Sequence, residues 1–212
     1  MLIVLSPAKT LDFSKTIKEY PYSLPIYTKE ATQLIKILKK FKPEDISQLM
    51  GVSAKLADLN YERFLRWNPD HQPDNSQQAV VAFKGDVYEG LQANTLNIDE
   101  LNYLNKQLRI LAGLYGVLRP FDIIREYRLE MGTKLENQKG RDLYQFWGNK
   151  ISKTIEKAIE DSEGEKVLVN LASNEYFKTI GVKKFKYQVI TPVFKEFKDG
   201  QHQFVSFFAK KA

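Results

Sequence analysis

Polar and basic side chains follow four apolar segments of this sequence, and together they have the chemistry of an anion-binding site. The segments begin at residues 2, 79, 108 and 167, and their apolar, β-prone composition is typical of buried strands. The carboxyl ends of neighbouring parallel strands meet at one edge of a sheet, where open α/β folds bind their ligands. We therefore expect one basic cleft that binds a phosphate-bearing ligand. Its predicted residues are Ser6, Lys9, Lys84, Arg109, Arg119, Asn170 and Ser173, with Lys178 in the short helix that follows.

Two acidic residues near these loops, Glu130 and Asp86, are the candidate catalytic residues of such a cleft. In an enzyme that acts on a phosphorylated or nucleotide ligand, Lys9, Lys84 and Arg128 would hold the anion while a carboxylate moves a proton. Ordinary ion pairing accounts for the same charged residues about as well. No Walker loop, GxGxxG or GxSxG pattern occurs in the chain, so a standard nucleotide fold is not indicated.

The segment 108–120, LRILAGLYGVLRP, is where we expect a strand to run into a tight turn beside the ligand. Gly113 and Gly116 allow the backbone to bend and to approach a ligand closely. The segment lacks the lysine of a Walker loop and the third glycine of the dinucleotide pattern, so we interpret the turn as one wall of a shared cleft. It would place its two arginines beside the lysines of the neighbouring loops.

A second candidate site lies between two helices that we predict within residues 43–67. The connection around Gly51 resembles the hairpin of the helix-hairpin-helix motif, whose backbone N–H groups bind a DNA phosphate. Residues 50 and 53 depart from the usual proline and glycine of that motif, so an ordinary helix pair with a capping Ser53 fits the local sequence about as well. The predicted DNA-binding residues are Gly51, Ser53, Lys55, Arg63 and Arg66.

The overall composition is that of a globular protein with a positive charge. The 212 residues include 32 Lys and Arg against 26 Asp and Glu, a formal net charge of +6, which favours encounters with nucleic acid. There is no cysteine, and the two histidines, His71 and His202, are far apart in sequence. We expect both at the surface and predict no metal site and no cofactor. No apolar run approaches the roughly 20 residues of a membrane-spanning helix, so we expect a cytoplasmic protein with no membrane partner.

The elements that must position these residues are short apolar strands and amphipathic helices. We expect one domain over residues 1–212, of the α/β (mixed α+β) class, with a mixed central sheet flanked by helices. A hairpin turn is predicted at 198–200. The expected strands cover residues 2–5, 79–83, 108–111, 127–132, 166–171, 187–194 and 203–209.

Capping residues indicate where three further helices begin. Thr28 stands before an apolar stripe with helical spacing, and Asn97 forms a capping pair with Glu100. Asp142 would cap a long amphipathic helix that continues through Gly148, although an interior glycine costs a helix about 1 kcal/mol.

Six long segments, taken together, resemble the YaaA family of bacterial peroxide stress resistance proteins, also described as UPF0246 or DUF328. They are distributed over essentially the whole chain, which makes the resemblance specific. Family members usually continue beyond the SFFAKKA segment (206–212) with a further basic and aromatic tail, whereas this sequence ends there. The six segments are SPAKTLDF (6–13), FKGDVYEGL (83–91), LRILAGLYGVLRPFD (108–122), YRLEMGTKL (127–135), GRDLYQFWG (140–148) and NLASNEYFK (170–178).

The resemblance implies a mixed α/β architecture, called the cantaloupe fold in this family, with a helix-hairpin-helix element and a basic cleft. It implies that Gly51, Ser53 and Lys55 belong to the hairpin. The cleft residues that it implies are Lys9, Lys84, Arg109, Arg119 and Arg128.

The resemblance also implies a cytoplasmic role in limiting oxidative damage to DNA when hydrogen peroxide meets intracellular iron. Our leading hypothesis is therefore a protein of the peroxide stress response that binds double-stranded or distorted DNA without sequence specificity. One alternative is the enzyme described above, acting on a phosphorylated or nucleotide ligand. Another is a scaffold whose cleft binds acidic residues of a partner protein.

Overall fold

A five-stranded sheet organises the fold. The computed structural model describes residues 1–14, 21–198, 200–203 and 210. The strand order is β6-β5-β1-β8-β9. β1 (Leu2–Leu5) lies between β5 (Leu108–Ala112) and β8 (Val167–Asn170), and β9 (Gln188–Ile190) continues this parallel arrangement, whereas β6 (Gly116–Leu118) is antiparallel to β5. The predicted mixed sheet is confirmed, and the carboxyl ends of four of its strands lie at the same edge.

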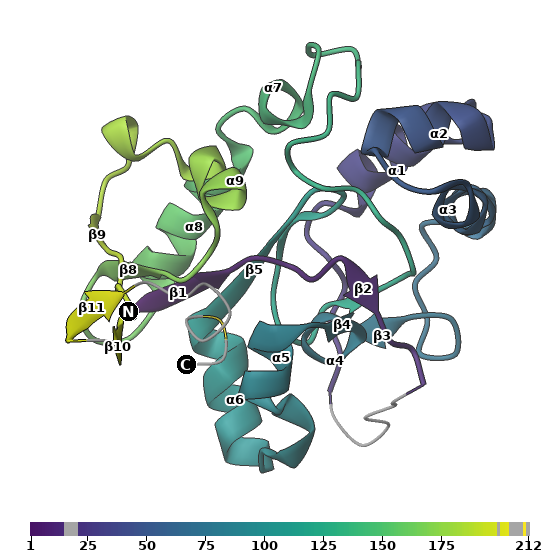
Figure 1. Cartoon of the computed structure of the whole chain (residues 1–212). Helices are drawn as coiled ribbons and strands as arrows, with labels where there is room; N and C mark the ends of the chain where they lie inside the picture. Colours follow the sequence, from purple (N-terminus) through teal and green to yellow (C-terminus); the bar gives the residue numbers. More distant parts are fainter. Residues whose placement is uncertain (15–20, 199, 204–209, 211–212) are drawn as a thin grey trace.

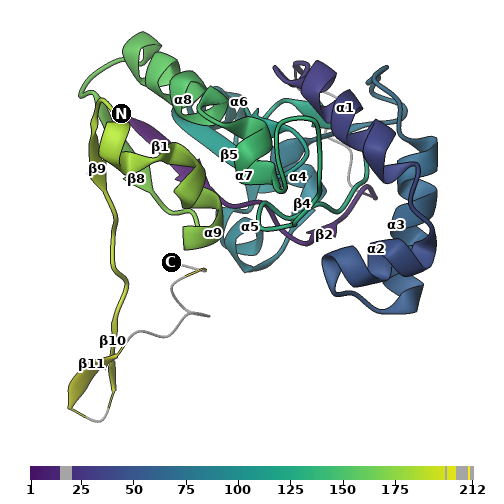
Figure 2. The same cartoon turned by 90° about the horizontal axis from the view of Figure 1, so that it is seen from above.

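Helices flank this sheet (Figure 1). Figure 1 shows α8 (Lys150–Asp161) above the strands and α6 (Ile98–Gln107) below them. In Figures 1 and 2, α2 (Pro43–Met50) and α3 (Ala54–Arg66) lie at the end of the molecule opposite to β9. The other helices are α1 (Thr28–Leu38), α4 (Ala79–Ala82), α5 (Asp86–Leu91), α7 (Leu143–Trp147) and α9 (Asn174–Phe177), with 3-10 turns η1 (Ala93–Thr95), η2 (Lys178–Ile180) and η3 (Val182–Lys184).

Three small antiparallel strand pairs tie the connecting segments together. β2 (Thr10–Leu11) pairs with β4 (Phe83–Lys84), β3 (Gln77–Gln78) pairs with β7 (Ile123–Ile124), and β10 (Glu196–Lys198) pairs with β11 (Gln201–Gln203). The first pair matters for the site because it fixes the chain after β1 against the chain before α5.

The core is one hydrophobic cluster between the sheet and the helices. Its largest fully buried side chains include Trp67, Trp147 and Tyr115. Ile151, Ile155 and Ile159 repeat every fourth position of α8, so they lie on one face of the helix, and all three are completely buried. Burial of this apolar surface is the main favourable contribution to folding.

Local helix signals predicted several elements correctly. Two helices meet at residues 51–53, and Pro43 lies in the first turn of α2, where its missing N–H leaves no bond unmade. The Asn97 side chain accepts hydrogen bonds from the N–H groups of Asp99 and Glu100, and the Glu100 carboxylate accepts one from Asn97 N–H. This reciprocal capping box confirms the predicted start of α6.

The prediction of a strand over residues 79–83 is wrong. Ala79–Ala82 forms the short helix α4, and only Phe83 and Lys84 are extended, in β4. A short apolar run with two alanines is as compatible with a buried helical turn as with a buried strand. The N–H groups of Ala79 and Val80 donate to the carbonyls of Asp122 and Pro120, which holds the segment outside the central sheet.

The predicted strand over residues 127–132 is also absent from the described strands. The side chains of Tyr127, Leu129 and Met131 are buried and alternate with more exposed neighbours, as a strand would place them. The backbone nevertheless joins no ladder there. The alternation of apolar and polar residues therefore predicted correctly which side chains are buried, but it did not predict whether the backbone pairs with another strand.

Two helix boundaries differ from the prediction. Asp142 caps α7 by accepting from Gln145 N–H at 2.8 Å, as expected, but the helix breaks at Gly148, whose φ of 52° and ψ of −121° are not helical. Thr28 is not a cap, because its hydroxyl donates to the Pro25 carbonyl and Tyr27 occupies the N-cap position.

The last predicted strands are confirmed only in part. β9 lies within the expected range 187–194, and β10 and β11 flank the predicted turn, but residues 204–209 of the expected final strand lie outside the described residues. His71, predicted at the surface, is only 3% exposed. Its ring is buried because polar partners inside the protein satisfy both of its nitrogen atoms.

Candidate functional site

The strand-end loops meet at the carboxyl edge of the sheet because β1 and β8 are neighbours. Ser173 N–H donates to Ser6 Oγ at 2.8 Å, and the two serine hydroxyls are 3.2 Å apart. Tyr88 Oη, from α5, donates to the Ser6 carbonyl at 2.8 Å. At the end of β8, Asn170 Oδ1 accepts from Ala172 N–H at 3.0 Å. The fold therefore brings Ser6, Asn170 and Ser173 to the same edge, where the two serines bind each other and Asn170 binds the backbone.

Charged residues form a second part of this edge. The Glu130 carboxylate accepts from Lys9 Nζ and from an Arg128 guanidinium nitrogen, each at 2.8 Å and each on a different oxygen. Arg128 Nε is buried and has no hydrogen-bond partner among the described residues. We call Lys9, Arg128 and Glu130 the strand-end charge cluster. Glu130, the candidate acid-base residue, thus binds both Lys9 and Arg128, the two candidate anion ligands. The two cations are therefore already paired with a carboxylate of the protein.

Lys84 lies beside a separate cavity of about 430 Å³. Its Nζ is 3.6 Å from Asp12 Oδ2, and hydrogen bonds from Ser14 together with this lysine lower the pKa of the Asp12 carboxyl. The volume falls within the range of small-molecule sites. Asp86, the other candidate catalytic residue, is the first residue of α5 and is partly buried. The cavity is lined by side chains that include Asp12, Val81, Phe83, Lys84, Tyr88 and Thr95.

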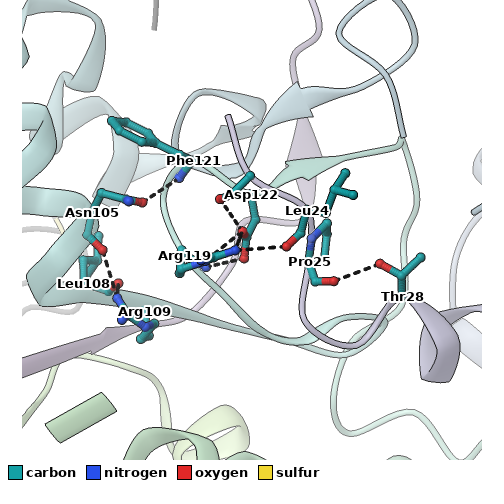
Figure 3. A network of polar contacts seen from close by, with 10 residues as sticks. Leu24, Pro25, Thr28, Asn105, Leu108, Arg109, Arg119, Phe121 and Asp122 are labelled. Atoms are coloured by element: carbon teal, nitrogen blue, oxygen red, sulfur yellow. Dashed lines mark hydrogen bonds and ion pairs between the residues drawn. The ribbon is translucent and has the colours of Figure 1, made fainter. Parts of the chain in front are cut away.

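Two of the predicted cleft arginines have structural contacts elsewhere (Figure 3). Arg109 donates to the carbonyls of Asn105, Lys106 and Leu108 at 3.0, 3.3 and 2.7 Å, at the carboxyl end of α6. A guanidinium is favourable there because the last carbonyls of a helix have no partner within it. These contacts hold the start of β5, so Arg109 is not brought to the strand-end charge cluster.

Arg119 binds a buried carboxylate in the same region. Its guanidinium is 2.9 Å from Asp122 Oδ1, and it also donates to the Leu24 carbonyl at 3.1 Å (Figure 3). Asp122 is fully buried, and burial raises the pKa of its carboxyl, while hydrogen bonds from Ser23 and Arg119 act in the opposite direction. Arg119 therefore compensates a buried charge and fastens the segment around Leu24 to the core.

The glycine-containing turn between β5 and β6 packs against the protein itself. A Cβ atom on Gly113 would lie 2.2 Å from the Leu129 carbonyl oxygen. Trp147 Nε1 donates to the Gly113 carbonyl at 3.0 Å, and Leu114 and Tyr115 are completely buried. Gly113 is therefore required for close approach to the chain around residue 129, whereas we expected close approach to a ligand.

The helix pair α2 and α3, with its connection 51–53, is here called the α2–α3 hairpin. Gly51 has a φ of 61°, and the Ser47 hydroxyl donates to the Val52 carbonyl at 2.7 Å, which closes the turn. Ser53 occupies the N-cap position of α3, but its side chain makes no capping hydrogen bond. Gly51, Ser53 and Lys55 are all exposed at this end of the hairpin.

The two arginines of α3 are paired within the protein. Arg63 binds Glu126 at 2.6 Å and is 15% exposed, so it fastens α3 to the segment after β7. Arg66 pairs with Glu62 at 2.9 Å on the surface of the same helix. The remaining predicted cleft cation, Lys178, places its Nζ 4.6 Å from the centre of the Tyr144 ring. None of these three stands beside the exposed turn of the hairpin.

A buried polar network was not anticipated from the sequence. Tyr115 Oη lies 3.0 Å from Trp67 Nε1, 2.9 Å from His71 Nε2 and 3.2 Å from Arg125 N. The one available signal was a tyrosine between two glycines in an apolar strand-turn segment. The sequence offers no local rule that pairs it with a histidine 44 positions earlier.

Two kinds of site are not found in the part of the chain that the structure describes. No group of three or more His, Cys, Asp and Glu side chains is arranged so that it could hold a metal ion. No helix within the described ranges has the length and apolar character needed to cross a bilayer.

Comparison with known proteins gives a consistent result over the whole chain. The family model described as peroxide stress protein YaaA matches residues 1–212. A UPF0246 protein of Shewanella baltica (strain OS195) is 51% identical over all 212 residues, which correspond to 82% of that protein.

Proposed function

Because this chain belongs to the family of the peroxide stress protein YaaA, we propose that it binds the phosphate backbone of DNA during peroxide stress. Binding would use the α2–α3 hairpin and would not depend on base sequence, since backbone phosphates are the same at every step. We further propose that the bound protein shields DNA from iron-dependent oxidation.

The amino end of α3 is the observation that carries this proposal. The N–H groups of Ala54, Lys55 and Leu56 make no hydrogen bond to any described residue, and the side chain of Ser53 does not cap them. The first turn of α3 also contains no acidic residue. Unsatisfied N–H groups and the positive end of the helix dipole favour an anion at this position.

The amino ends of α2 and α6 differ from that of α3. The first turn of α2 contains Glu44 and Asp45, and that of α6 contains Asp99 and Glu100 within a complete capping box. In α2 the Asp45 carboxylate accepts from Lys42 N–H, and in α6 Asn97 Oδ1 accepts from the N–H groups of Asp99 and Glu100. The end of α3 is open, and a phosphate would satisfy the same N–H groups.

Lys55 and Gly51 complete the proposed phosphate site. Lys55 follows the cap by two residues, and its exposed ammonium would add charge beside the N–H groups. Apart from Gly51 and its two chain neighbours, no described residue has an atom within 4 Å of the position that a Cβ on Gly51 would occupy, so the described part of the chain leaves room beside the turn for a DNA backbone. Arg63 and Arg66 would contribute less, because each already binds a glutamate.

Binding of three DNA forms tests the proposal. Duplex, bubble and single-stranded DNA of one length are titrated with the protein at two salt concentrations. We expect binding of several unrelated sequences with similar affinity, weakening as salt rises, because counterions are released from each contacted phosphate. Absence of binding at low salt, or affinity independent of salt, would contradict the proposal.

Protection is tested separately by strand breakage. Plasmid DNA is exposed to ferrous iron and hydrogen peroxide with the wild-type protein, with Lys55→Ala, or with Lys153→Ala. Lys153 is an exposed lysine of α8, and Figures 1 and 2 show this helix apart from α2 and α3, so Lys153 is a matched control for loss of one charge. We expect wild type and Lys153→Ala to reduce breakage and Lys55→Ala to reduce it less. Equal protection by all three proteins would show that protection does not depend on Lys55 of the hairpin.

A second candidate function is supported by the strand-end charge cluster. Lys9 and Arg128 hold the Glu130 carboxylate where a phosphate could bind in exchange, and Arg128 Nε is buried without a partner. The chain would then be an enzyme for a phosphorylated or nucleotide ligand, with Glu130 released to move a proton. Thermal stabilisation by nucleotides that is lost in Arg128→Gln would favour this function. No stabilisation at millimolar concentration would count against it.

A further inference from the structure

A buried tyrosine-histidine pair is the most specific polar arrangement that the proposed function leaves unused. Tyr115 is completely buried and His71 is 3% exposed. Tyr115 Oη and His71 Nε2 are 2.9 Å apart, and His71 Nδ1 is 2.9 Å from the Pro69 carbonyl oxygen. Both ring nitrogens of the histidine are therefore engaged inside the protein.

The hydrogen atoms of this pair follow from its partners. A carbonyl oxygen can only accept, so His71 Nδ1 carries hydrogen and Nε2 of the neutral ring is left as an acceptor. Independently, Tyr115 Oη already accepts from Trp67 Nε1 and from Arg125 N–H, both of which can only donate. The phenol hydrogen therefore points to His71 Nε2. Two separate arguments give the same direction for the bond.

Aromatic rings surround the pair. The ring of Trp67 is centred 6.4 Å from that of Tyr115, and the ring of Tyr127, in the segment between β7 and α7, is centred 5.3 Å from that of Tyr115. Tryptophan and tyrosine are the side chains that lose an electron most readily when no thiol is present, and this sequence has no cysteine. A hole formed on either neighbour can pass to Tyr115, since the phenol has a base ready to take its proton.

We propose that Tyr115 and His71 form a redox site that takes up oxidising equivalents generated by hydrogen peroxide. A one-electron oxidant such as hydroxyl radical gains an electron from Tyr115 through Trp67 or Tyr127 and is reduced to hydroxide. The Oη–H bond of Tyr115 breaks and its proton moves to His71 Nε2. The products are a neutral tyrosyl radical and an imidazolium, and a thiol or ascorbate can return the electron while the proton returns to Tyr115.

The surroundings keep His71 able to accept this proton. Burial lowers the pKa of the His71 imidazole, and the nearby charge of Arg125 acts in the same direction. The Pro69 carbonyl and Asp70 act in the opposite direction. His71 is therefore neutral near pH 7, and the imidazolium formed after oxidation has one carbonyl and one carboxylate to stabilise it.

A flash-oxidation experiment tests this site on the full chain. Photo-oxidised ruthenium tris-bipyridine, with persulfate as electron acceptor, removes one electron from the protein, and the radical is followed by transient absorption and electron paramagnetic resonance. We expect a neutral tyrosyl radical that is lost in Tyr115→Phe. Tyr103→Phe is the matched control, because Tyr103 is 60% exposed on α6, and it should leave that radical unchanged.

Proton transfer to His71 is tested by rate. His71→Gln keeps a hydrogen-bond acceptor but removes the base, so the radical should form more slowly. In the wild type, formation should slow in heavy water and as pH falls far enough to protonate His71. Both wild-type measurements decide the question if either variant fails to fold. An unchanged radical in Tyr115→Phe, or no effect of heavy water and pH on the wild-type rate, would overturn the proposal.

Discussion

The α2–α3 hairpin and the strand-end charge cluster both present an exposed lysine, but they differ in what the protein has already bound there. At the strand ends, Lys9 and Arg128 share the Glu130 carboxylate, so a ligand must displace an internal partner. At the hairpin, Lys55 makes no ion pair with a described residue, and the neighbouring N–H groups are unsatisfied. Net charge alone would not separate these sites. The comparison favours the hairpin over the strand ends as the site of the proposed DNA binding, because no internal carboxylate competes there.

The largest effect is expected from breaking the turn that supports the strand ends. Gly113→Ala would place a Cβ 2.2 Å from the carbonyl oxygen of Leu129, the residue between Arg128 and Glu130. The backbone must shift, and we expect a loss of about 3 kcal/mol in the free energy of unfolding. Urea denaturation measures it. A loss below about 1 kcal/mol would show that the two segments separate easily.

A smaller effect is expected from emptying the strand-end charge cluster. Glu130→Ala leaves Arg128, which is 17% exposed, without its carboxylate, and we expect a loss of about 2 kcal/mol. Added phosphate should restore part of this stability by occupying the same place. Glu62→Ala breaks the exposed pair with Arg66 and is the matched control, with an expected change of less than about 0.5 kcal/mol. Equal effects of the two variants would remove the distinction between the sites.

Acid should loosen the segment that follows the hairpin. The pKa of His71 is lowered by burial, so the unfolded chain binds a proton more readily than the folded one. The contribution of His71 to stability is then constant above about pH 6.5, and it decreases as pH falls below that value, by at most about 1.4 kcal/mol per pH unit. Chemical denaturation between pH 7.5 and about pH 5 measures this. His71→Gln should flatten the slope in this window, and an unchanged slope would assign it to other groups.

Apart from the Glu62→Ala control, the smallest change in stability is expected at the hairpin turn. Gly51→Ala puts a side chain into open space, but the left-handed backbone costs about 1 kcal/mol for a residue with a Cβ. Thermal unfolding and DNA affinity should both be measured, because the turn geometry sets the direction of the N–H groups. A stable variant with wild-type affinity would show that the hairpin can lose its glycine without cost to binding.

Sequence patterns predicted the elements whose signals are local. The Asn97 and Glu100 pair specified the start of α6 because both partners of the capping box lie within one helical turn. The two helices of the hairpin were likewise predicted from their apolar spacing and from Pro43. At the strand ends, Ser6 and Ser173 were brought together because parallel neighbours place their ends at one edge.

Features that depend on distant parts of the chain were not predictable in this way. Gly113 looks the same in sequence whether a ligand or the Leu129 backbone lies beside it. Arg109 was assigned to the cleft from its position next to a turn, but its guanidinium reaches back to the end of α6. The burial of His71 depends on Tyr115, and no local period connects the two. In each case the local sequence is compatible with two environments for the residue, and contacts with distant parts of the chain determine which one it has.

The salt dependence of duplex DNA binding by Lys55→Ala tests the central claim most directly. The logarithm of the affinity is measured against the logarithm of salt concentration for wild type, Lys55→Ala and the control Lys153→Ala. Loss of one phosphate contact should make the slope shallower by about 0.9 in Lys55→Ala, for every sequence tested, and leave it unchanged in the control. The same slope in all three proteins would contradict the assignment of DNA binding to the α2–α3 hairpin.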